Sequence, residues 1–214
     1  MGAWAVGPRS ITAMVLAGGR GRRWDEQDKG LITVDDKPMA QSALQRLQAK
    51  PHKALAGLAI NANRHLPSYA AWGWPVWPDD DPAAFHGPLA GWQTGLRHCC
   101  TPWLLSVPCD TPDFPEDLIG HMVQTQGQTG ATLVLAASQD PTGRHPHPMF
   151  ALLHTDLLPS LNAFVHDGGR RVMAWCEAQT PAWAVFDVRS EHDPFANLNS
   201  PADAELRRAN RSRT

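Results

Sequence analysis

A glycine-rich segment near the start of the chain combines a permissive backbone with positive charge. Residues 16–23 read Leu-Ala-Gly-Gly-Arg-Gly-Arg-Arg and directly follow a short apolar run. Glycines adopt positive φ and let the backbone approach an anion closely, so successive N–H groups can form a nest for a phosphate. The arginines supply charge for a polyphosphate. The pattern favours a phosphate-binding loop, and a glycine-rich turn without a ligand is the alternative.

Several sharper motifs are absent from the sequence. Gly19 and Gly21 fit the start of the dinucleotide pattern G-x-G-x-x-G, but Trp24 occupies the third glycine position. No Gly-Lys-Ser/Thr follows the loop, which excludes the P-loop pattern, and no G-x-S-x-G elbow offers an anchor for a hydrolase triad. His145 and His147 lie in a proline-rich stretch without a carboxylate at helical spacing, so they do not indicate a zinc site.

Two charged residues outside the loop are candidates for the same chemistry. Lys29 follows the loop closely and could fold back over its phosphates, although it could also be an ordinary surface lysine. Asp110 ends a buried run within Pro-Cys-Asp-Thr-Pro, and Mg²⁺ prefers one or two carboxylates together with substrate phosphate oxygens. Asp110 could instead cap the next helix, but Asp113, just before Pro115, is the better candidate for that cap.

Two asparagine pairs give weaker signals. Asn61 and Asn63 follow an apolar run and could contact a base or a ribose. Asn197 and Asn199 precede Ser-Pro and are typical of a strand end that turns into a helix. Ordinary turn chemistry explains both pairs about as well.

Strands and helices alternate along the chain. Helices are expected after Pro38, Pro88 and Pro115, where apolar residues recur at helical spacing. The remaining elements are expected strands at 11–16, 58–60, 75–77, 103–107, 131–136, 147–153 and 182–188, and helices around 161–165 and 171–178. The alternation predicts a single three-layer α/β/α domain with a mostly parallel, Rossmann-like sheet. Ligands bind beyond the carboxyl ends of such strands, where the glycine loop, Asn61, Asp79 and Asp110 fall.

Composition limits the class of protein. The chain has 214 residues and a formal charge of −2, which suits one domain and excludes a basic field for non-specific nucleic-acid binding. No apolar run reaches the length of a membrane span, and four cysteines without metal-site spacing indicate reduced thiols in the cytoplasm. We expect a frayed start over 1–10, a folded domain over 11–206, and a basic tail over 207–214 that is a solvated helix end or disordered.

Taken together, these segments resemble the nucleoside-triphosphate transferases, and within them the molybdenum-cofactor guanylyltransferase branch. The residues Leu-Ala-Gly-Gly with Gly21 and Arg23 match the superfamily signature, as do the runs at 28–31 and 36–38. The branch is indicated by the runs at 61–64, 86–91, 108–112, 169–173 and 195–201. Trp24 departs from the usual Met of the family, and the acidic run 79–81 leaves the alignment ambiguous by one residue, where we choose Asp79.

The resemblance implies a function and a set of site residues. The implied reaction transfers GMP from GTP to the terminal phosphate of molybdopterin, with Mg²⁺ as cofactor and pyrophosphate as leaving group. The implied catalytic residues are Arg23, Lys29 and Asp110, with Asp110 as the metal ligand, and Asn197 and Asn199 are implied near the pterin. The implied GTP-binding residues are Leu16, Ala17, Gly18, Gly19, Gly21, Lys29, Asn61, Asp79 and Asp110.

Other functions stay open at this stage. A related nucleotidyltransferase could use CTP or take a sugar phosphate as acceptor, and a non-catalytic protein could deliver the cofactor to an apoenzyme. The resemblance also allows other cofactor-biosynthesis proteins and molybdoenzyme clients as partners. An intact carboxylate at Asp110 favours catalysis over delivery.

Overall fold

The computed structural model describes residues 4–17, 20–21, 27–81, 87–188 and 193–211. Within these ranges a seven-stranded sheet forms the centre, in the order β11-β9-β10-β8-β1-β6-β7. Its strands are β1 (Ile11–Leu16), β6 (Leu55–Asn61), β7 (Val76–Trp77), β8 (Trp103–Pro108), β9 (Leu133–Asp140), β10 (Gly143–His154) and β11 (Ala182–Asp187). Every pairing is parallel except those of β10 with β8 and β9. The predicted mostly parallel sheet is confirmed.

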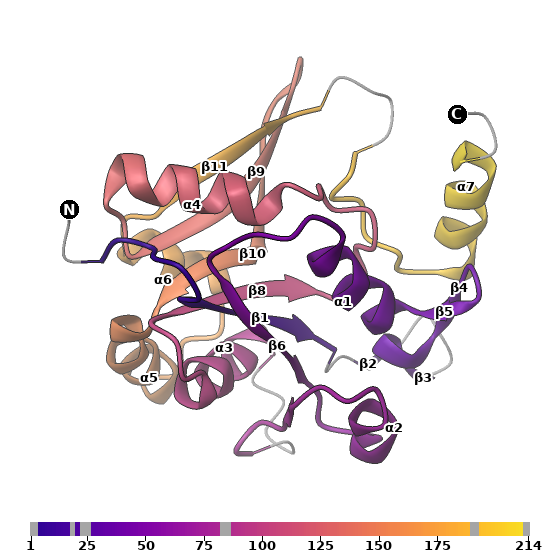
Figure 1. The fold of residues 1–214 in the computed structure, drawn as a ribbon, viewed down its shortest axis with the longest axis horizontal. Helices are drawn as coiled ribbons and strands as arrows, with labels where there is room; N and C mark the ends of the chain where they lie inside the picture. Colours follow the sequence, from indigo (N-terminus) through magenta and orange to yellow (C-terminus); the bar gives the residue numbers. More distant parts are fainter. Residues whose placement is uncertain (1–3, 18–19, 22–26, 82–86, 189–192, 212–214) are drawn as a thin grey trace.

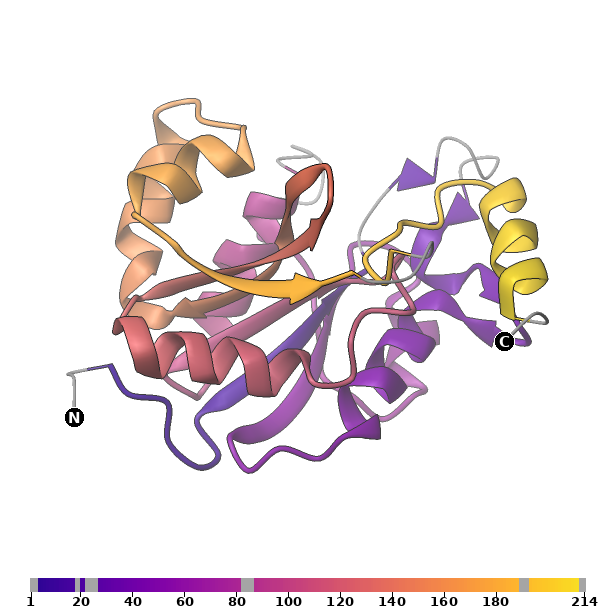
Figure 2. The same ribbon diagram turned by 90° about the horizontal axis from the view of Figure 1, so that it is seen from above.

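Helices cover both faces of this sheet (Figure 1). Helices α1 (Met39–Ala49) and α4 (Leu118–Thr129) pack on one face, where a single buried cluster joins their apolar residues to the strands. Helices α3 (Pro88–His98), α5 (Leu158–His166) and α6 (Val172–Ala178) pack on the other face around a second cluster. Figure 2 shows the sheet edge-on between the two helical layers. The predicted three-layer architecture is therefore confirmed.

The apolar pattern explains why the main elements form where they do. Strand β1 is buried along almost all of its length, as expected of a central parallel strand covered on both faces. In α1, Ala40, Ala43, Leu44 and Leu47 recur at helical spacing and are buried against the sheet. Pro38 directly precedes this helix and Pro88 is the first residue of α3, where a missing N–H is tolerated.

The sequence did not predict the shorter elements. They are β2 (Arg20–Gly21), β3 (Gln27–Asp28), η1 (Lys29–Leu31), β4 (Thr33–Val34), β5 (Lys37–Pro38), α2 (Leu66–Ala70) and η2 (Thr155–Leu157). Elements of two to five residues are too short to show a period. Asp35 and Asp36 form the turn between β4 and β5 with positive φ, a conformation that Asp tolerates better than most residues.

Three local predictions differ from the structure. The strand expected at 147–153 is longer than predicted, because β10 begins at Gly143 and includes the proline-rich stretch with His145; it pairs with β9 through an irregular register. Helix α4 begins at Leu118, because the residues after Pro115 form a turn with Leu118 N donating to Pro115 O. Residues 193–200 contain no strand, although helix α7 (Pro201–Arg211) follows them as expected.

Both predicted chain ends need correction. The segment from Trp4 to Ser10 was expected to be frayed, but Gln126 Nε2 donates to Trp4 O at 2.9 Å and Arg9 N to Lys53 O at 2.9 Å. The predicted basic tail is wrong at Arg207, which is buried in α7 and paired with two carboxylates. Helix α7 lies beside α1 and the β4–β5 hairpin (Figure 1). None of the described helices is long and apolar enough to cross a membrane.

Candidate active site

A cavity of about 390 Å³ opens where β1, β6 and β8 end. These three strands are parallel neighbours, so their carboxyl ends meet at one edge of the sheet, as the sequence predicted. The cavity is lined by Leu16, Lys29, Asn61, Asp79, Gly87, Pro88, Pro108, Cys109, Asp110, Pro146, His147, Pro148, Met149, Phe150, Phe195 and Asn197. In the sheet order, β6 and β7 lie on one side of β1 and bring Asn61 and Asp79, whereas β10 lies on the other side and brings the mostly apolar residues 146–150.

Lys29 and Asp110 meet in the middle of this cavity. Lys29 Nζ lies 2.5 Å from Asp110 Oδ2, and the same ammonium donates to Asn199 Oδ1 at 2.8 Å. Both charged side chains keep 17% of their surface exposed, so the pair is accessible from the cavity. Lys29 is therefore not a solvated surface lysine. Its side chain connects its own segment to Asp110 and to Asn199, which lie far away in the sequence.

The position of Lys29 is fixed by the residues around it. Lys29 begins the short helix η1, and Asp28 Oδ1 accepts hydrogen bonds from Gly30 N at 3.3 Å and from Tyr69 Oη at 2.7 Å. Gly30 is required, since a Cβ there would lie 2.9 Å from the Cβ of Ala17. Burial and the neighbouring carboxylate raise the pKa of Tyr69, so its hydroxyl stays a donor to Asp28.

Asp110 stands at the end of β8 in a rigid setting. Cys109 N donates to Leu16 O at 3.1 Å, and Asp110 O accepts from Leu198 N at 2.7 Å. Burial, followed by the charge of Asp110, raises the pKa of the Cys109 thiol far above its ordinary value. Cys109 is therefore a neutral packing residue and not a nucleophile.

The described residues offer a metal ion one carboxylate and no complete set of protein ligands. No group of three or more His, Cys, Asp or Glu side chains suited to a metal occurs within the described part of the chain. This excludes a closed protein cage among those residues, but Mg²⁺ commonly takes one carboxylate and fills its other positions with water and substrate phosphate. Asp110 presents one such carboxylate to the cavity.

The polar end of the cavity is built on Asn61 and Asp79. Asn61 Nδ2 donates to Trp77 O at 2.9 Å and to Asp79 Oδ1 at 2.8 Å. Asn63 Nδ2 donates to Asp79 Oδ2 at 2.7 Å, and Asn63 Oδ1 accepts from Asp79 N at 2.7 Å. The structure places Asp79 at the cavity, whereas Asp80 forms an ion pair with Arg97.

Two further residues at this end were not anticipated. Thr94 on α3 is buried and donates to Asp79 Oδ1 at 3.3 Å. A Cβ on Gly91 would lie 2.6 Å from Leu16 Cδ2 and 2.7 Å from Asn61 Oδ1, so the helix approaches the cavity wall as closely as glycine allows. Gly91 ends the run at 86–91 noted in the sequence, but nothing in the spacing of that run shows that Gly91 packs against Asn61.

The opposite end combines two asparagines with an aromatic wall. Asn197 accepts a hydrogen bond from Thr111 Oγ1 at 2.6 Å and lines the cavity. Asn199 accepts a hydrogen bond from Lys29 Nζ. The His147 ring stacks on Phe195 with ring centroids 4.4 Å apart, and burial lowers the pKa of His147. The sequence did not predict this wall, because its rings come from distant segments that carry no shared pattern.

Part of the predicted glycine loop lies outside the described residues, namely Gly18, Gly19, Arg22 and Arg23. Gly21 belongs to β2, which pairs with β3. Ala17 is buried below the cavity and donates its N–H to Asn61 O at 2.9 Å. Ala17 thus follows Leu16 of the cavity lining, and the strand that contains Gly21 pairs with the residues just before Lys29.

Comparison with known proteins gives one consistent result. Residues 13–182 match the family model described as the MobA-like NTP transferase domain. The molybdenum cofactor guanylyltransferase of Acidovorax ebreus is 42% identical over 207 residues, covering 94% of this chain and 95% of that protein. The enzyme of the same name from Bordetella pertussis is 38% identical over 198 residues, covering 92% of this chain and 96% of that protein.

Solved structures share the fold at much lower identity. Molybdopterin-guanine dinucleotide biosynthesis protein A from Archaeoglobus fulgidus has a TM-score of 0.71 and 17% identity, covering 95% of this chain and 100% of that one. A CMP:2-keto-3-deoxy-manno-octonic acid synthetase complexed with CTP has a TM-score of 0.69 and 12% identity, covering 95% and 98%. At these identities the likeness concerns the fold alone.

Proposed function

We propose that this chain, which belongs to the MobA-like NTP transferase family, transfers GMP from GTP to the terminal phosphate of molybdopterin. The products are pyrophosphate and the guanine dinucleotide form of the cofactor. Relatives that match nearly the whole chain at 38–42% identity carry the name of this activity. The observation that carries the proposal is the contact of Lys29 with both Asp110 and Asn199, because it joins the nucleotide side of the cavity to the acceptor side.

The reaction is an in-line displacement at phosphorus. An oxygen of the molybdopterin phosphate attacks the α-phosphorus of GTP and forms the new P–O bond. The bond from that phosphorus to the bridging oxygen breaks, and pyrophosphate leaves with the electron pair. The attacking phosphate is already ionised, so no general base is needed and catalysis rests on positioning and charge neutralisation.

The cavity offers a role for each charged residue. The Lys29 ammonium would neutralise phosphate charge where donor and acceptor meet, since it contacts both Asp110 and Asn199. Asp110 would hold Mg²⁺, which supplies Lewis-acid polarisation of the phosphate oxygens when bound. We place Arg23 and the glycines 18, 19 and 21 beside the leaving pyrophosphate, on the strength of the sequence signature.

We assign the polar end of the cavity to the nucleotide and the apolar end to the pterin. Asn61 and Asp79 would orient the nucleoside, with Leu16 and Ala17 forming the strand end beneath it. Asn197 and Asn199 would contact the acceptor, whose planar pterin suits the apolar wall of His147 and Phe195. With the two substrates bound in this way, the reacting phosphates would lie over Lys29 and Asp110.

We also propose partners and a cellular location for this chain. We expect the product to be handed over between this chain, other cofactor-biosynthesis proteins and molybdoenzyme clients. A cytoplasmic location is supported by the four cysteines, all of which are unpaired. These partners and this location extend what the names of the relatives imply.

A pyrophosphate-release assay with the four nucleoside triphosphates tests the function. Release should require GTP, Mg²⁺ and molybdopterin together, and ATP, CTP and UTP should support much slower release, because a site that hydrogen-bonds one base edge rejects the others. Faster release with CTP would replace the guanylyl assignment by a cytidylyl one. Tight GTP binding without any release would favour a delivery protein.

A further inference from the structure

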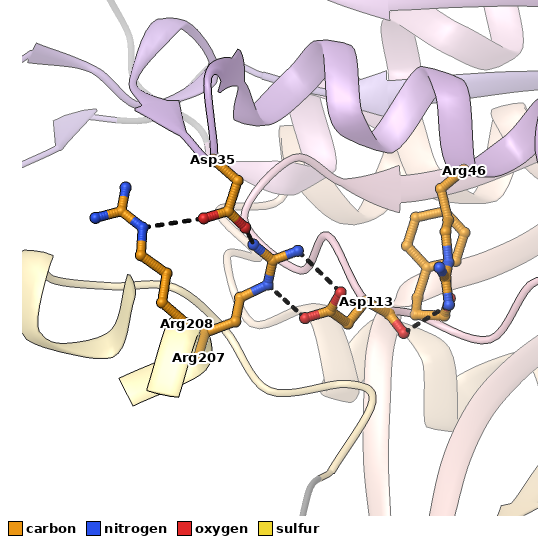
Figure 3. A network of polar contacts seen from close by, with 6 residues as sticks. Asp35, Arg46, Asp113, Arg207 and Arg208 are labelled. Atoms are coloured by element: carbon orange, nitrogen blue, oxygen red, sulfur yellow. Dashed lines mark hydrogen bonds and ion pairs between the residues drawn. The ribbon is translucent and has the colours of Figure 1, made fainter. Parts of the chain in front are cut away.

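Arg207 is an arginine buried in the C-terminal helix and held by two carboxylates (Figure 3). Its Nε and Nη2 donate to the two oxygens of Asp113 at 2.5 and 3.0 Å, and its Nη1 pairs with Asp35. Only 7% of the Arg207 side chain is exposed, and removing such a charge from water is unfavourable unless partners compensate. Neighbouring Arg208 also pairs with Asp35, but its side chain is 56% exposed.

Each partner of Arg207 belongs to a segment that carries a site residue. Asp113 lies on the loop that begins with Asp110. Asp35 forms the turn of the β4–β5 hairpin, which follows directly on η1 and Lys29. Arg207 therefore ties the segments of Lys29 and Asp110 to α7.

The segment that carries Asn199 is also fixed to α7. At the start of α7, Asp203 Oδ2 accepts hydrogen bonds from Asn199 N at 2.8 Å and from Ser200 N at 2.9 Å. A small buried cluster of Ile32, Val34, Met39, Leu198 and Ala204 packs the same helix start onto the hairpin. A shift of α7 would therefore move Asn199 relative to Lys29.

We infer that Arg207 is a positioning residue for the transfer reaction, acting through α7 to hold Asn199, Lys29 and Asp110 in register. The inference rests on the proposed function. The bidentate fork to Asp113 fixes distance and orientation together, which a single point charge would not. Loop 110–114 is also anchored by Arg46 Nε donating to Phe114 O at 2.7 Å, so the loop has a second support besides Arg207.

Kinetics of Arg207→Gln, Lys29→Ala and the double variant test the inference. Arg207→Gln should lower kcat about tenfold to a hundredfold, since small misplacements of reacting groups have effects of that size, and should leave the KM for GTP within about twofold. In the Lys29→Ala background the same change should have a clearly smaller effect, because one of the three groups that Arg207 positions is gone. Arg208→Gln is the matched control on the same helix and should leave kcat unchanged.

A second readout does not depend on turnover. Amide hydrogen exchange at Leu198, whose N–H donates to Asp110 O, should speed up at least about tenfold in Arg207→Gln and stay at the wild-type rate in Arg208→Gln. If wild type makes no guanine dinucleotide, the proposed function fails, and the exchange result still decides whether Arg207 holds the register. If Arg207→Gln does not fold, Asp35→Asn removes one arm of the network at a turn position that Asn tolerates.

Two outcomes would overturn the inference. One is an equal fall of kcat for Arg207→Gln with and without Lys29, which indicates an independent role. The other is unchanged exchange at Leu198 together with unchanged kcat in a folded Arg207→Gln variant.

Discussion

Lys29 Nζ and Asp110 Oδ2 lie 2.5 Å apart although 81 positions separate the two residues in sequence. Lys29 is presented by a helix of three residues, and Asp110 by the end of a buried strand. The same ammonium donates to Asn199, so one cation is shared by a candidate metal ligand and an amide proposed to lie near the acceptor. Changes to either member of the pair should therefore affect catalysis more than folding.

Replacing Asp110 by Asn should abolish most turnover while the fold survives. The amide keeps the shape of the side chain but loses the charge that Mg²⁺ and Lys29 require. We expect kcat to fall by a factor that corresponds to several kcal/mol of barrier, where each ~1.4 kcal/mol is tenfold. Initial rates at saturating GTP and Mg²⁺ measure this. Asp36→Asn, at an exposed turn, is the control, and wild-type turnover in Asp110→Asn would remove Asp110 from the mechanism.

Replacing Lys29 by Ala should slow transfer and weaken GTP binding. The lost ammonium would otherwise neutralise phosphate charge, and raising the salt concentration should reproduce part of the loss in wild type. Stability should fall by ~1–3 kcal/mol, because the largely buried carboxylate of Asp110 and amide of Asn199 each lose a hydrogen-bond partner. Lys37→Ala serves as control, since Lys37 is exposed and bonded only to Gln45 among the contacts described. A large loss of stability with intact turnover would make Lys29 a structural ion-pair partner.

The main strands and the strand-end residues were predictable from sequence because they depend on local pattern. The apolar run 11–16 predicts β1 with its observed bounds, and runs ending near Asn61 and Asp110 place both residues at one edge of the sheet. Parallel neighbours have their carboxyl ends together, so the general location of the site follows from topology.

The contacts that complete the site were not predictable, since they depend on partners far along the chain. Arg207 looks like the first residue of a solvated basic tail, yet it is buried by carboxylates 94 and 172 positions away. Asp113 likewise looks like a helix cap, but its carboxylate binds Arg207 and α4 starts later. No periodicity or local propensity reports such long-range pairing of charges.

Gly91→Ala should impair nucleotide binding, and Gly95→Ala should not. An added Cβ at Gly91 would meet Leu16 and Asn61, whereas one at Gly95 would meet Leu104 and Met14 away from the cavity. Both changes overpack the interface between α3 and the sheet, which typically destabilises by ~1–3 kcal/mol. Urea unfolding should show similar losses, while the KM for GTP should rise at least about tenfold only for Gly91→Ala. A normal KM for GTP in Gly91→Ala would indicate that Asn61 does not contribute to GTP binding.

Stability should decrease as pH falls below the ordinary histidine pKa of about 6.5. Burial lowers the pKa of His147, which Asp193 opposes, so the unfolded chain binds more protons than the folded chain just below that pH. Stability therefore rises with pH through this window and is lost on acidification. The slope of the urea midpoint between pH 7 and pH 5.5 should be smaller in His147→Gln than in wild type. His166→Gln, at an exposed helix end, should keep the wild-type slope, and equal slopes in all three proteins would contradict the assignment to His147.

Labelled GTP tests the central claim of nucleotidyl transfer most directly. Wild-type protein is incubated with Mg²⁺, molybdopterin and GTP that carries the label on either the α- or the γ-phosphate, and the pterin product is separated from the nucleotides. The α-label should appear in the pterin product in equal amount to the pyrophosphate released, and the γ-label should appear only in pyrophosphate. Recovery of the γ-label on the pterin, or of the α-label only in free GMP, would contradict the account.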